Sequence, residues 1–174
     1  MTADPSGTIV QQIAGVESNP TSTLTLTSAT TARSANTLVA NNATAGSIVV
    51  PSLTLTNPGA LIPRLRLSIN DATSTAWGAV SVQIDLWSAA PTFTNGDGGA
   101  FAVATGAANH LGSYTGTFSA VAGDGVYAEL APVVGTVSAP RLAAPTIYWS
   151  MIAVSATGVT GASKTVTLTA ETLS

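Results

Sequence analysis

Apolar and polar residues alternate along most of this chain, with the period of two that is typical of β-strands with one buried face. Residues 23–27 read Thr-Leu-Thr-Leu-Thr, and residues 52–56 read Ser-Leu-Thr-Leu-Thr. The clearest strands are 64–70 and 79–87, and further candidates are 100–104, 110–118, 126–130, 147–155 and 164–171. No stretch of ten residues has helical periodicity, so the pattern predicts about eight to ten strands.

The strand at 79–87 also predicts which side chains face the core. Val80, Val82, Ile84 and Leu86 share one face, which places Trp87 on the opposite face at the strand end. An outward tryptophan there is either covered by the following loop or buried as an anchor between chains. The sequence leaves both alternatives open.

Clusters of Asn, Asp, Gly and Pro separate the strands, as at 57–59, 95–99 and 123–125. Short strands divided by polar turns at this density predict an all-β protein, an antiparallel β-sandwich of the jelly-roll type. An up-and-down barrel is the alternative.

The first 20 residues do not alternate and are rich in small and polar side chains, although Ile9, Val10, Ile13 and Val16 are apolar. We expect residues 1–20 to form an extended N-terminal arm that contacts a partner, and residues 21–174 to form a single sandwich domain. The start of the chain also lacks the basic and apolar regions of a secretory signal, so we expect a protein made and used without export.

The charge balance narrows the possible partners. Five Lys and Arg against eight Asp and Glu give a net charge of −3 and a pI of about 4.7, which argues against nucleic acid and anionic membranes as partners. Only 7% of the residues are charged, and the mean hydropathy is +0.40. A surface this poor in charge favours association with other protein chains.

Candidate catalytic chemistry is sparse. The chain has no cysteine and a single histidine, His110, and it contains no Gly-x-Ser-x-Gly motif. Asn95 and Asp97 have the spacing of the first EF-hand ligands, but Gly106 stands where a bidentate glutamate is required. We therefore expect no catalytic residues, no metal site and no cofactor.

Arg64 and Arg66 share one face of their strand and concentrate positive charge in a chain with few cations. Pairing across strands with Asp85 or Asp71 is one explanation, and contact with a partner protein is the other.

A resemblance to a known family appears between residues 85 and 112. A strand ending in Leu86-Trp87 is followed by Pro91-Thr92-Phe93-Thr94, then by Asp97-Gly98-Gly99-Ala100-Phe101, then by Leu111-Gly112. This order resembles a segment of the small capsid decoration, or cement, proteins of tailed bacteriophages. The stretch 147–152 is similar to the penultimate strand of that family.

The resemblance implies a β-rich homotrimer that binds the outside of the expanded phage head and bridges subunits of the major capsid protein. The protein would be made in the host cytoplasm and reside on the capsid exterior. A head or tail fibre module that binds host-surface glycans is the alternative.

The loop from Trp87 to Phe101 carries this resemblance, and its length predicts internal packing. We expect Phe93 and Phe101 to lie beneath the loop, and Asp97 to cap its turn through backbone amides. Candidate trimer or capsid contacts are Trp87, Arg64, Arg66, Ile9, Val10 and Ile13, together with this loop.

Overall fold

The computed structural model describes residues 19–26, 32–56, 61–69, 77–121, 125–133, 145–158 and 164–173. Residues 1–18 of the proposed arm, which include Ile9, Val10 and Ile13, lie outside the described residues. At its end, the Pro20 carbonyl accepts a hydrogen bond from the Ala170 amide at 3.0 Å, which joins the chain to the domain just before the first strand.

The protein is nearly all β, as the alternation predicts. The strands are β1 (Thr21–Leu26), β2 (Thr37–Val39), β3 (Ser52–Thr54), β4 (Leu61–Ile69), β5 (Ser81–Trp87), β6 (Thr92–Phe93), β7 (Val103–Thr105), β8 (His110–Thr117), β9 (Ser119–Val121), β10 (Gly125–Pro132), β11 (Thr146–Ala153) and β12 (Lys164–Leu173). Two 3₁₀ turns, η1 (Ala45–Ser47) and η3 (Ala107–Asn109), lie between them. No helix in the described part of the chain is long and apolar enough to span a membrane.

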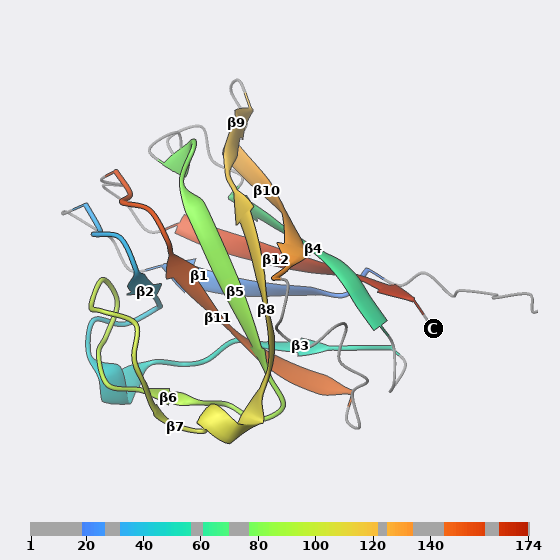
Figure 1. Cartoon of the computed structure of the whole chain (residues 1–174), viewed down its shortest axis with the longest axis horizontal. Helices are drawn as coiled ribbons and strands as arrows, with labels where there is room; N and C mark the ends of the chain where they lie inside the picture. Colours follow the sequence, from blue (N-terminus) through green and yellow to red (C-terminus); the bar gives the residue numbers. More distant parts are fainter. Residues whose placement is uncertain are drawn as a thin grey trace, which may run out of the picture.

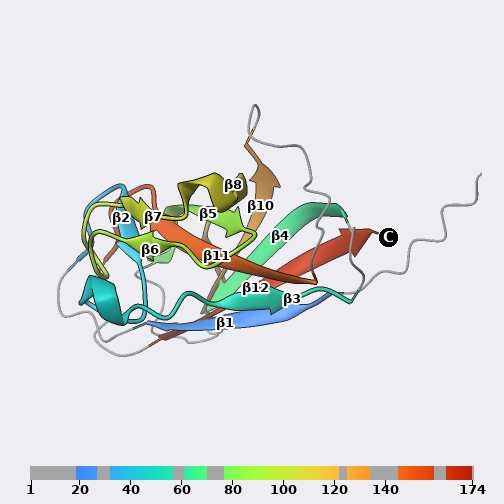
Figure 2. The same ribbon diagram turned by 90° about the horizontal axis from the view of Figure 1, so that it is seen from below.

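The strands pair antiparallel in the order β1-β12-β4-β10-β8-β5-β11-β2, with β3 added to β11 and β9 added to β10. The sheet folds over into two facing layers (Figures 1 and 2). Strand β10 joins the layers, because Val126–Leu130 pairs with β4 whereas Ala131 and Pro132 pair with β8. The expected antiparallel sandwich is confirmed. The jelly-roll connectivity stays a prediction. The alternative, an up-and-down barrel, would have neighbouring strands in sequential order, and the strand order here is not sequential.

Close approach of the layers at this corner requires a small residue. A Cβ atom built on Gly116 of β8 would overlap the backbone carbonyl of Glu129 on β10. Glycine therefore lets β8 and β10 meet where the sheet turns from one layer to the other.

The main core lies between the two layers. Val80, Val82, Ile84 and Leu86 are all buried in it, which confirms the inward face predicted for this strand. Trp149 of β11 and Leu65 of β4 lie in the same core. Each Å² of apolar surface removed from water stabilises the folded state by about 25 cal/mol, so this core is the main source of stability.

A second, smaller core lies on the outer side of β2, beneath the β6–β7 hairpin and η1. Leu38, Ala40 and Phe93 form its centre, with Phe101 packed against them. The rings of Phe93 and Phe101 are 5.7 Å apart with 49° between their planes. The packing predicted for the two phenylalanines beneath the loop is confirmed.

Candidate functional site

Trp87 is covered in this chain. Its side chain is on the outer face of β5, but the residue is only 3% exposed. The indole Nε1 donates a hydrogen bond to Ser150 Oγ at 3.0 Å, and the His110 ring lies 4.9 Å away, edge to face. Of the two alternatives, the structure therefore shows a tryptophan packed within its own fold.

A buried polar cluster lies beside Trp87 on the same outer face. Asp85 of β5 is directly opposite Ser113 of β8 on one side and Ser150 of β11 on the other. Asp85 Oδ1 accepts hydrogen bonds from Ser113 Oγ at 2.6 Å and from Gln83 Nε2 at 2.8 Å. His110 Nε2 lies 3.6 Å from the same carboxylate oxygen.

The cluster contains Ser, His and Asp side chains, but it does not have the order of a catalytic triad. In a triad, histidine lies between the serine and the carboxylate and uses a different ring nitrogen for each. Here His110 Nε2 faces both Ser113 Oγ, at 3.2 Å, and Asp85 Oδ1. Ser113 donates directly to Asp85, so the hydroxyl is engaged as a hydrogen-bond donor within a buried network.

This cluster was not predicted from the sequence. The alternation of 79–87 places Asp85 on the outer face, where a carboxylate is expected to reach solvent. In the structure its side chain is 5% exposed and accepts hydrogen bonds from Ser113 and Gln83. The only available signal was the outward position of Asp85 next to Trp87, which does not reveal the pairing with Ser113.

A buried charge pair involves Asp97, the acidic residue of the loop that carries the family resemblance. Asp97 Oδ2 lies 2.6 Å from the Arg33 guanidinium, and Oδ1 accepts a second hydrogen bond from Arg33 Nε at 3.2 Å. Asp97 Oδ1 also accepts the backbone amide of Ala40 at 2.9 Å. Asp97 therefore holds a backbone amide of the segment after β2, and the predicted cap on the loop's own turn stays a prediction.

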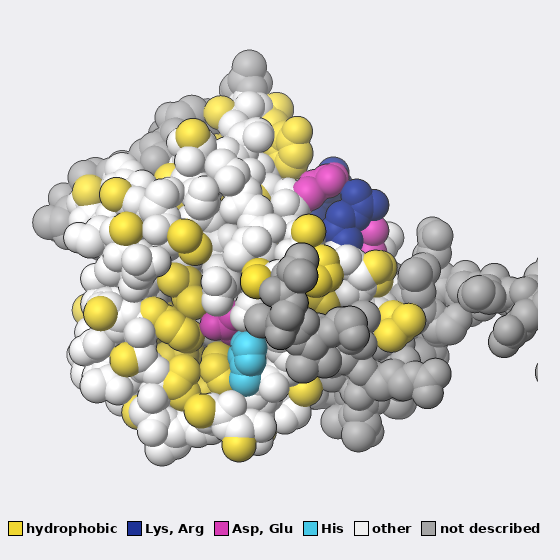
Figure 3. All heavy atoms as spheres, viewed as in Figure 1, with side chains coloured by type: hydrophobic (Ala, Val, Ile, Leu, Met, Phe, Trp, Pro, Cys, Tyr) yellow, Lys and Arg dark blue, Asp and Glu magenta, His cyan; other side chains and the backbone are white. Residues whose placement is uncertain are grey.

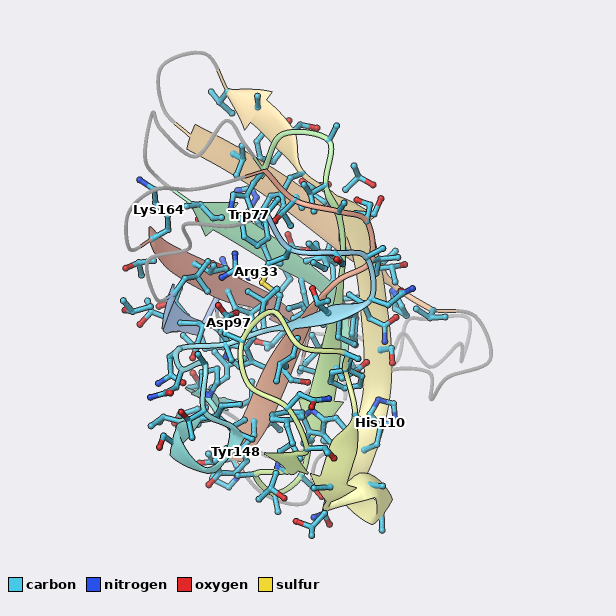
Figure 4. The ribbon with its side chains drawn as sticks, turned by 90° about the vertical axis from the view of Figure 1, so that its left-hand side faces the viewer. Arg33, Trp77, Asp97, His110, Tyr148 and Lys164 are labelled. Carbon is cyan, nitrogen blue, oxygen red and sulfur yellow. The ribbon has the colours of Figure 1, made fainter. Side chains whose placement is uncertain are left out.

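Arg33 is held from several sides. Its backbone exchanges hydrogen bonds with Thr157, whose Oγ1 accepts from the Arg33 amide at 3.2 Å. Its guanidinium carbon lies 5.5 Å from the centre of the Trp77 ring, and Figure 4 shows Arg33 between Trp77 and Asp97. Arg33 Nη1 and Trp77 Nε1 are buried and have no hydrogen-bond partner among the described residues. Asp97 is thus engaged by an arginine, and no group of three or more potential metal-ligating side chains occurs in the described ranges.

Arg64 and Arg66 lie on the outer face of the other layer, together with two glutamates. Arg64 contacts Glu171 Oε2 at 3.0 Å and Glu129 Oε2 at 3.2 Å, and Arg66 lies 3.6 Å from Glu129 Oε1. We call these four residues the charged strip. The hydrogen bond with Glu171, together with the nearby carboxylate charges, raises the pKa of Arg64 above its usual value.

Cross-strand pairing of the two arginines is therefore observed, but the predicted partner Asp85 is wrong. Asp85 is buried in the opposite layer, and Asp71 lies outside the described residues. The pairs form because β10 and β12 flank β4 on its two sides, with Arg66 opposite Glu129 and Arg64 opposite Glu171.

The remaining residues of the family-like loop are structural in this chain. Pro91 is buried, and the Thr92 hydroxyl lies 2.7 Å from the hydroxyl of Thr105 across the β6–β7 hairpin. Leu111 packs against the main core, and Gly112 is buried opposite Leu86. Within the loop from Trp87 to Phe101, Pro91 and Phe93 are thus buried, whereas residues 88–90, Thr92 and Thr94 are exposed.

Charges are almost absent from the described surface outside the charged strip. Arg33 and Lys164 are buried, as are Asp85 and most of Asp97. Figure 3 shows the blue and magenta side chains of the strip gathered at one edge of a mostly uncharged face. Threonines such as Thr23, Thr54 and Thr115 are exposed on the outer sides of their strands.

No protein-family model matches this chain, and no curated protein matches it.

Proposed function

We propose that this chain is a capsid decoration protein, which binds the outside of a phage head as a homotrimer and bridges neighbouring subunits of the major capsid protein. The observation that carries the proposal is the neutral surface. Charged side chains of the described residues are buried or are paired within the charged strip, and uncharged side chains, exposed threonines among them, cover the rest of the described surface.

This surface suits a large contact with another protein. The central parts of protein interfaces are depleted in charged residues, because each charge removed from water has to be compensated by a partner. Removing a threonine hydroxyl or an alanine methyl group from water costs less than removing a charged group. The same lack of charge gives no attraction to a phosphate backbone.

Stabilisation of a shell then follows from mass action. A protein that binds the expanded shell and neither the unexpanded shell nor free subunits adds its binding free energy to the assembled state. A rigid trimer also presents three contacts at once, so weak individual contacts act at a high effective concentration. No catalytic step is required.

Binding to purified shells tests the proposal. The chain would be mixed with expanded heads and with unexpanded procapsids, both assembled from the major capsid protein of the phage that encodes it, and its occupancy measured after sedimentation. We expect saturable binding to expanded heads alone and a higher temperature of head disruption. Equal binding to both shells, or no binding to either, would contradict the proposal.

Charge insertion would locate the contact. Thr23→Glu on β1, Thr54→Glu on β3 and Thr115→Glu on β8 place one carboxylate on three separate parts of the neutral surface, and the matching Thr→Ser variants serve as controls. We expect at least one glutamate variant to lose occupancy while keeping its melting temperature. Full occupancy for all three would argue against binding through these neutral faces.

A further inference from the structure

A groove lies on the outer face of the protein where β10 is flanked by β9 and β8 on one side and by β4 on the other. It has a volume of about 430 Å³ and includes two residues of the charged strip, Arg66 and Glu129. Its lining residues are Arg66, Thr117, Ser119, Tyr127, Ala128 and Glu129. Of these residues, only Arg66 was predicted from the sequence to have a functional role, as a candidate contact with the capsid or within the trimer.

Tyr127 gives the groove an exposed aromatic surface. It is 40% exposed, and it is the only aromatic residue among the large exposed hydrophobic residues of the described ranges, the others being Val49, Leu61 and Val121. The Arg66 guanidinium carbon lies 6.0 Å from the ring centre, at the outer limit of a cation–π contact. Ser119 is directly opposite Tyr127 across the β9–β10 pair.

The ionic groups of the groove balance each other. Arg66 and Glu129 are 3.6 Å apart, and both side chains are at least half exposed. An anion or a cation would have to compete with this internal pair for its partner. A neutral ligand can instead accept hydrogen bonds from the guanidinium and donate to the carboxylate without separating the two charges.

We propose that this groove binds a neutral saccharide. The apolar C–H face of a sugar ring would stack on Tyr127, while its hydroxyl groups would exchange hydrogen bonds with Arg66 and Glu129 and with the hydroxyls of Thr117 and Ser119. One aromatic face among several polar side chains matches a sugar ring, which has an apolar C–H face and hydroxyl groups around its edge. The site lies on a sheet face rather than on a loop, so its groups are held in fixed register.

A titration of the isotope-labelled full chain with lactose, maltose, cellobiose and diacetylchitobiose, followed by backbone amide NMR, tests the site. At least one disaccharide should shift the amides of Tyr127, Glu129, Thr117 and Ser119 in a saturable manner. Tyr127→Ala should weaken that binding about tenfold, whereas Tyr127→Phe should retain it because the ring is kept.

Two glutamates provide a matched control. Glu129 and Glu171 are similarly exposed and both pair with Arg64, but only Glu129 lines the groove. Glu129→Gln should therefore weaken saccharide binding, and Glu171→Gln should leave it unchanged. The proposal is overturned if none of the four disaccharides shifts the groove amides, if Tyr127→Ala binds as tightly as the unmodified chain, or if both glutamate variants bind equally. Loss of head occupancy by Tyr127→Ala without any saccharide binding would assign the groove to a protein contact instead.

Discussion

Arg33 and Asp97 form a two-pronged ion pair in which both side chains are more than nine-tenths buried. The pair ties the segment before β2 to the loop after β6, two parts of the chain separated by 64 residues. The same carboxylate accepts a hydrogen bond from the Ala40 amide, so one acidic side chain holds the segments before and after β2. This makes Asp97 a positioning residue for the loop that carries the family resemblance.

Removing one member of this pair should be strongly destabilising. Asp97→Asn leaves the Arg33 charge buried without its counter-ion, and we expect a loss of about 3–5 kcal/mol in the free energy of unfolding. Urea denaturation would measure the loss. Glu171→Gln is the control, since it disrupts an ion pair that is half exposed and should leave the stability nearly unchanged. An Asp97→Asn variant as stable as this control would show that the buried pair has no structural role.

Trp87→Ala should act on the fold. The substitution removes a buried ring that packs against His110 and bonds to Ser150, and we expect a cost of about 3–5 kcal/mol. Ser150→Ala removes only the hydrogen-bond partner and should cost about 1 kcal/mol. Thermal melting of both variants would measure the difference. An unchanged melting temperature with lost head occupancy would instead identify Trp87 as a contact with the capsid.

Tyr114 should make stability depend on pH in the alkaline range. Burial raises the pKa of its phenol to about 12, and its hydroxyl donates to the Ile62 carbonyl at 2.6 Å. Because the usual pKa is about 10, the unfolded chain releases this proton first. The contribution of Tyr114 is therefore complete below about pH 10 and is lost as the pH rises toward about 12.

Denaturation at a series of alkaline pH values would show this loss. Tyr114→Phe should remove the part of the pH dependence that belongs to this phenol, and should lower stability at neutral pH by about 1–3 kcal/mol because the Ile62 carbonyl loses its partner. A variant with the same alkaline profile as the unmodified chain would show that other groups control it.

The neutral surface predicts association of the isolated chain. We expect light scattering of a dilute sample to give a mass close to three times the 17.2 kDa of one chain. A mass of 17.2 kDa across the accessible concentration range would contradict the trimer and would weaken the multivalent part of the proposed function.

Most of the strands could be predicted from the sequence, because alternation is a local property of a strand with one buried face. The pattern at 79–87 identified both the strand and its inward residues, and the turn predicted at 95–99 lies between β6 and β7. Short strands without a full alternation were missed, namely β2, β6 and β9. These strands are defined by their partners rather than by their own residues.

The sequence by itself therefore determined an all-β chain, the inward face of its main strands and a surface with few charges. Only the tertiary structure decided which polar residues meet. Asp85 binds Ser113, Arg33 binds Asp97, and Arg66 lies beside Tyr127 and Glu129, because the sheet order brings together strands that are far apart in the chain. The period of two specifies which face a side chain occupies, but the neighbour on that face depends on strand order and register, which are set by packing of the whole sandwich.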